Sequence, residues 1–279
     1  MGQMSIPGME QPNLLRRTFE RIRPRMSPSL LVIGAQKAGT SALFNMLAQH
    51  PKAAAPSVKE LDFFSDDAAY TKGMAHYRSL FRAIPAKSFG HFTFEASPSY
   101  LYYAGRTAPR IAKDLPGVIC MAILRDPVKR AFSAWNMFRD FKDNPKRGHL
   151  HDPRSFQQAV EDELAGRTEH AYHCYLARGC YAEQVRQFKT VLPQGMLLIR
   201  SYKTFKHDPA GVVAEVCEAL GQDPLPAGHG AFSLKANTRP YTDKLDPVLA
   251  KELYQYFAPS LNELKQVLGH ELDLLESYG

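Results

Sequence analysis

The stretch SLLVIGAQKAGTS, residues 29–41, joins an aliphatic run to the start of a helical pattern. The run has no polar residue before Gly34, as expected for a strand that is buried on both faces. Gly34 and Gly39 bracket a short turn, and apolar residues recur at helical spacing from Thr40 onward. A strand that enters a helix through such a turn points backbone N–H groups and the positive end of the helix dipole toward one place. The stretch therefore predicts an anion-binding loop.

The position of the lysine separates this loop from that of a nucleoside triphosphatase. In a Walker A loop the lysine follows the second glycine, whereas Lys37 precedes Gly39 by two positions. No apolar run ends convincingly in an aspartate placed to bind Mg²⁺, so the pattern favours a single phosphate over a metal-bound triphosphate. Thr40 and Ser41 add hydroxyl donors. Two alternatives stay open at this point: a kinase-like phosphotransferase, and a tight turn with an incidental lysine.

A second segment, AILRDPVKRAFSAW (122–135), repeats the arrangement of an apolar run followed by a helical pattern. Arg125 stands where the run ends, and open α/β sheets bind ligands at the carboxyl ends of their strands. Ser133 follows two helical turns later and is able to face the same crevice. A guanidinium with a hydroxyl is a pocket for a second phosphate. The alternative is an exposed arginine followed by Asp126 as a helix N-cap.

Strand and helix patterns alternate along the rest of the chain. Strands are predicted at 29–34, 91–95, 118–124 and 196–200, and helices at 40–49, 127–139, after 155, at 181–191 and 209–221, with two more after 246. This alternation predicts the α/β class, with a central, mainly parallel sheet flanked by helices. No repeat or linker divides the pattern. We therefore expect a flexible N-terminal extension over 1–28 and a single domain over 29–279.

Composition and charge narrow the function classes. The chain has 279 residues, of which 44% are hydrophobic, and a formal net charge of +7, which suits a globular protein with anionic ligands. The basic residues are dispersed and form no RNA- or DNA-binding signature, so nucleic acid is not an expected partner. Four cysteines show no metal-ligand spacing, and we expect no metal. Without a secretory signal or an apolar run of about 20 residues, neither a membrane span nor export is expected, which favours the cytoplasm.

Several segments together resemble a known enzyme family. KAGTSAL (37–43) and LRDPVKRAFSAW (124–135) resemble the 5′- and 3′-phosphate-binding segments of sulfotransferases, which use 3′-phosphoadenosine 5′-phosphosulfate (PAPS). VKELDFFSDD (58–67), FEASPSYLY (94–102) and RGCYAEQVRQF (178–188) resemble segments of the heparan-sulfate sulfotransferase branch. The resemblance implies a P-loop-like three-layer fold and a PAPS-dependent sulfotransferase.

The resemblance also assigns the donor site. It implies that the 5′-phosphosulfate is held by the loop residues Lys37, Ala38, Gly39, Thr40 and Ser41, and the 3′-phosphate by Arg125 and Ser133. Tyr181 is expected near the nucleotide, and Lys235 and Arg239 are expected in a basic loop that closes the 3′-phosphate side. Sulfuryl transfer, like phosphoryl transfer, passes through a loose in-line transition state, so catalysis depends on positioning and on charge stabilisation.

The catalytic base maps by resemblance onto Glu60, with His91 and Glu95 as rival bases. A carboxylate suits the task because an attacking alcohol loses its proton as the new bond forms. Lys37 would neutralise charge on the bridging oxygen. One departure is Ala96, which stands where the heparan-type segment has a lysine, and Lys59 is our candidate for the missing cation.

The acceptor is expected to be a hydroxyl, less readily an amine, of a carbohydrate or other small molecule. Phe63, His91, Glu95 and Tyr100 are the predicted acceptor contacts. Aromatic residues suit a sugar, a phenol or a lipid-like chain equally well. A nucleotide-binding protein without activity is a further alternative, against which Lys37 and Glu60 argue.

Overall fold

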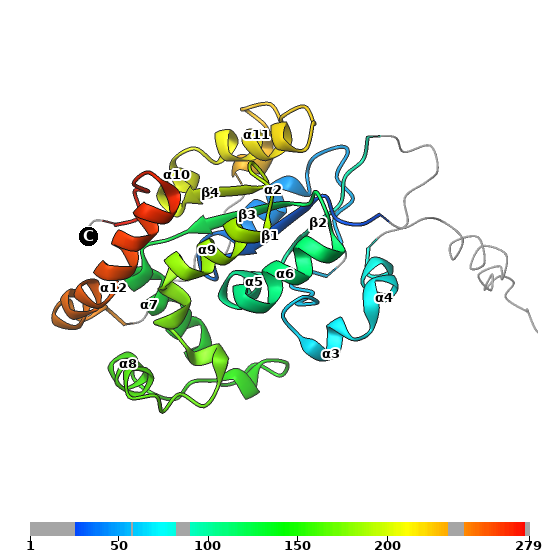
Figure 1. The fold of residues 1–279 in the computed structure, drawn as a ribbon. Helices are drawn as coiled ribbons and strands as arrows, with labels where there is room; N and C mark the ends of the chain where they lie inside the picture. The colour runs from blue at the N-terminus through cyan, green and yellow to red at the C-terminus, as the bar shows by residue number, and fades with distance from the viewer. Residues whose placement is uncertain (1–25, 57, 82–89, 234–242, 277–279) are drawn as a thin grey trace, which may run out of the picture.

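The computed structural model describes residues 26–56, 58–81, 90–233 and 243–276. Within these ranges the centre of the fold is a four-stranded sheet in the order β2-β1-β3-β4, in which every pairing is parallel (Figure 1). The strands are β1 (Leu30–Gly34), β2 (Phe94–Ala96), β3 (Ile119–Leu124) and β4 (Leu197–Ser201). The predicted parallel sheet is confirmed, although the second strand begins at Phe94 instead of His91.

Helices cover both faces of this sheet (Figure 1). On one face lie α2 (Thr40–Leu47), α10 (Tyr202–His207) and α11 (Pro209–Ala219). On the other face lie α5 (Ser99–Tyr102), α6 (Ala104–Asp114), α9 (Tyr181–Val191) and α12 (Pro247–Leu268). The remaining helices are α3 (Asp67–Tyr70), α4 (Gly73–Ser79), α7 (Pro127–Arg139), α8 (Phe156–Leu164) and the 3₁₀ turns Gly148–Leu150, Ala171–His173, Ala177–Gly179 and Gly230–Ser233. The expected three-layer α/β arrangement is therefore confirmed.

The central strands β1 and β3 are buried along their whole length. Since helices cover both faces, their side chains have no solvent side, which explains why both runs are aliphatic without alternation. Each such leucine or isoleucine stabilises the fold by about 1.5–3 kcal/mol. A second, smaller apolar cluster joins α7, α8 and α12. The sheet is thus a rigid base from which the loops at its carboxyl edge project.

Aspartate–proline pairs start three of the described helices. Asp126, Asp208 and Asp246 cap α7, α11 and α12, and each precedes a proline at the first helical position. Each carboxylate accepts hydrogen bonds from N–H groups that the first turn leaves unpaired, a contact that stabilises a helix by about 1 kcal/mol. Ser155 caps α8 by accepting from the Gln158 N–H at 3.1 Å, which confirms the predicted helix start.

The two helical patterns predicted after residue 246 form one helix, so that prediction was wrong. Pro259 lies inside α12 and removes one backbone donor, which made the pattern resemble two helices. The buried residues Ala250, Leu253, Phe257 and Leu264 keep one apolar stripe on both sides of that proline. Packing of this stripe outweighs the lost bond. Among the described helices, none combines the length and apolarity that crossing a membrane requires.

Candidate functional site

The anion loop lies at the carboxyl end of β1, as predicted. Gly39 is the N-cap of α2 and has φ 88°, and a Cβ atom there would lie 3.0 Å from the ring of Phe205. Glycine is therefore required both by the left-handed backbone and by the space. No side chain caps α2, in contrast to α7, where Asp126 accepts from two N–H groups. The first turn of α2 thus keeps its N–H donors for an anion.

Lys59 joins this loop to the predicted base. Its Nζ donates to Ser41 Oγ at 2.5 Å and lies 3.1 Å from Glu60 Oε1. The side chain of Lys59 is 23% exposed, and that of Glu60 is 43% exposed. Ser41, Lys59 and Glu60, which were predicted from two separate segments, therefore form one contiguous group. The cation lies between the anion loop and a solvent-accessible carboxylate.

The backbone around Glu60 is held in an unusual conformation. Glu60 and Asp62 have φ 61° and 51°, in the left-handed region that costs a non-glycine residue about 1–3 kcal/mol. Hydrogen bonds to the end of β2 support the turn: the Glu60 N–H donates to the Ala96 carbonyl at 3.1 Å, and the Asp62 N–H donates to Ser97 Oγ at 3.1 Å. The turn is thus fixed to the carboxyl edge of the sheet.

Asp62 is a second carboxylate beside the predicted base, and the sequence reasoning missed it. Ser99 Oγ donates to its Oδ1. Burial raises the pKa of Asp62, and the nearby charge of Glu60 adds to the rise. The charge of Arg178 lowers the pKa of Asp62. The Arg178 guanidinium lies 4.2 Å from the centroid of the Tyr102 ring. The left-handed backbone is a tertiary property, so no local sequence signal marked this residue.

Arg125 reaches the anion loop from the neighbouring strand. Its Nη1 donates to the Lys37 carbonyl at 3.1 Å, and its guanidinium lies over the Tyr202 ring at 4.8 Å. Its Nε donates to Glu276 Oε1 at 2.8 Å. The structure therefore places Arg125 against the backbone of Lys37, a contact that the sequence did not predict. It adds Tyr202 and Glu276, neither of which was predicted.

Tyr181 and Ser133 are both buried. Tyr181 is fully buried, and its hydroxyl donates to the Arg125 carbonyl at 2.9 Å. Burial raises the pKa of Tyr181 to about 12, so it is a neutral donor. Tyr181 thus holds the end of β3, which favours a role in positioning Arg125. Ser133 is buried in α7, with 3% of its surface exposed.

Glu95, Tyr100 and Phe63 lie in the interior. The carboxylate of Glu95 is fully buried and accepts from Ser97 Oγ and Tyr100 OH, both at 2.6 Å, and from Tyr77 OH. Burial raises the pKa of Glu95. Phe63 stacks on Tyr77 with ring centroids 4.5 Å apart. This enclosure argues against Glu95 as the base and against direct acceptor contacts from these three side chains.

The position of His91 argues against His91 as the base. Glu60 contacts Ala96, the last residue of β2, and β2 runs parallel to β1. His91 precedes β2, at the amino end of the sheet. Extended chain advances about 3.3 Å per residue, so His91 lies roughly 16 Å from the edge at which the anion loop and Glu60 meet. Lys235 and Arg239 lie outside the described residues.

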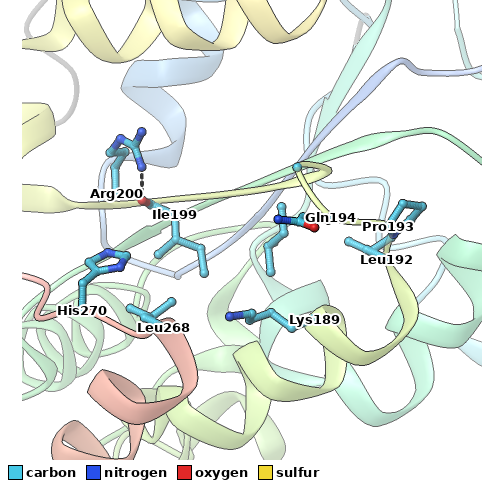
Figure 2. Close-up of a pocket in the computed structure, with 10 residues that line it drawn as sticks. Lys189, Leu192, Pro193, Gln194, Ile199, Arg200, Leu268 and His270 are labelled. Carbon is cyan, nitrogen blue, oxygen red and sulfur yellow. Dashed lines mark hydrogen bonds between the residues drawn. The ribbon is translucent and has the colours of Figure 1, made fainter.

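A cavity of about 420 Å³ runs along the edge strand β4 (Figure 2). Leucines and Ile199 form its walls, and Lys189, Arg200 and His270 border it. Lys189 and Arg200 have other partners: Lys189 Nζ donates to the Val267 carbonyl, and Arg200 forms two bonds to the Glu215 carboxylate. None of the predicted donor or base residues lines this cavity.

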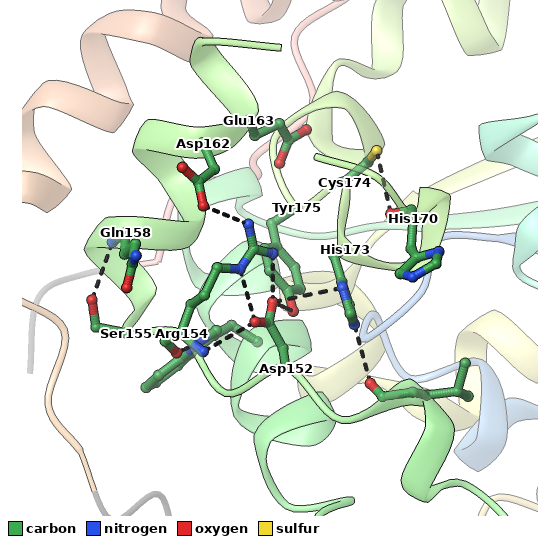
Figure 3. A network of polar contacts seen from close by, with 12 residues as sticks. Asp152, Arg154, Ser155, Gln158, Asp162, Glu163, His170, His173, Cys174 and Tyr175 are labelled. Atoms are coloured by element: carbon green, nitrogen blue, oxygen red, sulfur yellow. Dashed lines mark hydrogen bonds and ion pairs between the residues drawn. The ribbon is translucent and has the colours of Figure 1, made fainter. Parts of the chain in front are cut away.

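A polar network stabilises the chain between α7 and α9 (Figure 3). The buried Asp152 accepts from Arg154 Nη2 and from Tyr175 OH, each at 2.8 Å, and Arg154 also pairs with Asp162. Burial favours a higher pKa for Asp152, but these bonds outweigh it and lower the pKa. The network fixes Tyr175, whose carbonyl accepts from the buried Arg130. The side chains of Asp152, Arg154, Asp162 and Tyr175 satisfy one another, which indicates a structural role. Nε and Nη1 of the buried Arg130 have no hydrogen-bond partner among the described residues.

The side chains that metals prefer do not gather in the described part of the chain. Among those residues, no group of three or more His, Cys, Asp or Glu side chains is placed to hold a metal ion. The four cysteines are free thiols, of which Cys120 and Cys217 are buried as predicted.

Comparison with known proteins identifies a family and several relatives of this chain. The sulfotransferase domain model matches residues 27–230. The chain is 30% identical over 221 residues to the mouse heparan sulfate glucosamine 3-O-sulfotransferase 3B1, which covers 78% of the chain and 52% of that enzyme. It is 30% identical over 200 residues to the human bifunctional heparan sulfate N-deacetylase/N-sulfotransferase 3, covering 70% of the chain and 22% of that protein. The chain spans about half the length of the 3-O-sulfotransferases that it matches.

A solved structure shows the same fold. The sulfotransferase from Alicyclobacillus acidocaldarius superposes with a TM-score of 0.70 and 27% identity, covering 88% of this chain and 98% of that one. This likeness confirms the P-loop-like three-layer fold. From the matched domain and its relatives, the chain belongs to the sulfotransferase domain family.

Proposed function

We propose that this protein transfers the sulfuryl group of PAPS to a hydroxyl group of a carbohydrate or other small molecule, with Glu60 as the base. The observation that carries the proposal is the position of Lys59 between Ser41 of the anion loop and Glu60. A sulfuryl group held by the loop would lie beside a cation and a carboxylate at once. Charge stabilisation and proton removal are the two tasks that the reaction sets.

The donor site fits a nucleotide with phosphates at two positions. The uncapped start of α2, with Lys37, Thr40 and Ser41, suits the 5′-phosphosulfate, whose sulfuryl group is the one transferred. Arg125 follows the neighbouring strand and suits the 3′-phosphate, since a guanidinium binds phosphate through paired N–H groups. The contact between Arg125 and the Lys37 carbonyl links the two places. We assign Ser133, Lys235 and Arg239 to the 3′-phosphate side from the family resemblance.

Three side chains would carry the chemistry. Lys37 neutralises the charge that grows on the bridging oxygen as the donor bond breaks. Lys59 stabilises the transferring group. It takes the place of the lysine that the heparan-type segment has at the position of Ala96, whose side chain is buried and apolar. Glu60 accepts the proton of the acceptor hydroxyl. With two lysines to supply the positive charge, we propose a mechanism that needs no metal.

The relatives favour a carbohydrate as the acceptor class. Their names describe sulfation of heparan sulfate, at a glucosamine oxygen in one group and at a nitrogen in the other. A hydroxyl acceptor suits Glu60 better than an ammonium acceptor. The hydroxyl needs a base only as its bond to sulfur forms, whereas an ammonium group must lose a proton before it can attack. The cytoplasmic location expected from the sequence stays a prediction.

The first experiment measures binding. Adenosine 3′,5′-bisphosphate (PAP) should raise the melting temperature without Mg²⁺, whereas ATP with Mg²⁺ should raise it far less. The reverse order would favour the kinase-like alternative. The second experiment measures transfer of labelled sulfate from PAPS to a panel of sugars, phenols and lipid-like alcohols, with Lys37→Ala as the inactive control and Lys113→Ala as a surface control. A panel with no labelled product, together with intact PAP binding, would contradict the proposed activity.

A further inference from the structure

We propose that Glu276 is a specificity-determining residue that competes with the 3′-phosphate of the donor for Arg125. The proposal rests on the assignment of Arg125 to that phosphate. It starts from one contact: Glu276 Oε1 lies 2.8 Å from Arg125 Nε, although the two residues are 151 positions apart. A carboxylate, like a phosphate, is an anion that accepts charge-assisted hydrogen bonds from a guanidinium.

The backbone places Glu276 at this point firmly. After α12 the chain turns at Gly269, which has φ 80°, and runs back toward α10, where Asp273 pairs with Lys203 (Figure 1). Leu274 is 5% exposed and packs into the core. Two residues later, the Glu276 N–H donates to Asp126 Oδ2 at 3.1 Å. The segment is thus anchored up to the residue that carries the carboxylate.

The surroundings make the ion pair strong. The side chains of Arg125 and Glu276 are 14% and 25% exposed, so water screens their attraction only in part. Asp126, the nearest other carboxylate, is occupied by Tyr254 OH, by the Glu276 N–H and by the first turn of α7. Glu276 is therefore the carboxylate that a 3′-phosphate would meet at the Nε side of Arg125.

Competition follows from charge. A phosphate dianion beside Arg125 would stand within a few ångströms of the Glu276 carboxylate, and like charges at that distance repel. Binding of the 3′-phosphate must therefore weaken or break the Arg125–Glu276 pair. The consequence is a lower affinity for PAPS and for the product PAP than Arg125 alone would give. Faster product release is the expected benefit, since release limits the turnover of many enzymes.

The test compares two nucleotides on three proteins. Isothermal titration measures the Kd of PAP and of adenosine 5′-monophosphate for the wild type, for Glu276→Gln and for Glu271→Gln. Glu271 is the matched control because it lies in the same segment, pairs with Lys265 and is far more exposed. We expect Glu276→Gln to bind PAP on the order of tenfold tighter, the effect of one partly buried charge pair. Its Kd for the monophosphate, and both Kd values of Glu271→Gln, should stay at the wild-type level.

Two other results would overturn the proposal in distinguishable ways. If the wild type prefers PAP to the monophosphate and Glu276→Gln binds PAP equally or more weakly, Glu276 holds Arg125 in place and does not compete. If the wild type and Glu276→Gln both bind the two nucleotides alike, the assignment of Arg125 to a 3′-phosphate fails, and this proposal fails with it. Glu276→Ala serves as a second variant, and a melting curve of each free protein verifies folding.

Discussion

Lys59 donates from Nζ to Ser41 Oγ at 2.5 Å, across 18 positions of sequence. This contact fixes the distance between the turn that carries Glu60 and the helix start that carries the anion loop. It also explains how a chain with Ala96 at the family's lysine position keeps a cation at the proposed reaction centre. The predictions below test this group and its surroundings.

Replacement of Lys59 should affect the reaction more than folding. Lys59→Met removes a cation between the loop and Glu60, and loss of one such stabilising group costs about 10²–10³ in kcat. Lys59→Arg keeps the charge and should recover part of the rate. Steady-state kinetics with PAPS measure both, and exposed Lys72→Met is the control. An unchanged kcat in Lys59→Met would show that another cation replaces the absent lysine.

Glu60→Gln should separate catalysis from binding. The amide keeps the size and the hydrogen-bonding oxygen but cannot take a proton, so kcat should fall about 10²–10⁴-fold. The KM for PAPS should change little, because the base acts only when the proton moves. Asp67→Asn, an exposed carboxylate on the same segment, is the control. A Glu60→Gln enzyme with wild-type kcat would refute Glu60 as the base.

Arg125→Ala should reduce the affinity for PAP about 10–100-fold, as expected for one charge-assisted contact. The affinity for adenosine 5′-monophosphate should fall much less. Because Arg125 also donates to the Lys37 carbonyl, a small loss for the monophosphate is expected. Isothermal titration measures both affinities. Equal losses for the two nucleotides would mean that Arg125 maintains the shape of the loop and does not bind the 3′-phosphate.

Glu95 should give the stability a pH dependence of known sign. Burial raises the pKa of Glu95 above the usual value near 4.5, so the folded state holds this proton more tightly than the unfolded state. The stabilisation is complete below pH 4.5 and is lost as the pH rises through the folded-state pKa. Glu95→Gln lacks this titration.

Urea denaturation of the wild type and of Glu95→Gln, from pH 4.5 upward, checks this prediction. The free energy of unfolding of the wild type, relative to that of the variant, should fall as the pH rises. A relative stability that instead rises with pH would mean that its hydroxyl partners hold Glu95 ionised.

Local patterns predicted much of this fold. The aliphatic runs of β1 and β3 and the Asp-Pro start of α7 depend on neighbours in sequence, and all three were found as expected. The turn from Gly34 to Gly39 could be predicted from the sequence for the same reason, because the first turn of any helix has unpaired N–H groups. The helical continuity of α12 through Pro259 was not readable, because long-range packing decided it.

The sequence alone determined that a glycine-bracketed strand–turn–helix is present and which residues compose it. Only the tertiary structure decided where the other charged groups lie and which residues they contact. Glu95 is enclosed by hydroxyls from Tyr77 and Tyr100, and Glu276 reaches Arg125 from the far end of the chain. The difference has a physical cause: backbone hydrogen bonding and side-chain periodicity are local, whereas burial and ion pairing depend on which distant segments the sheet brings together.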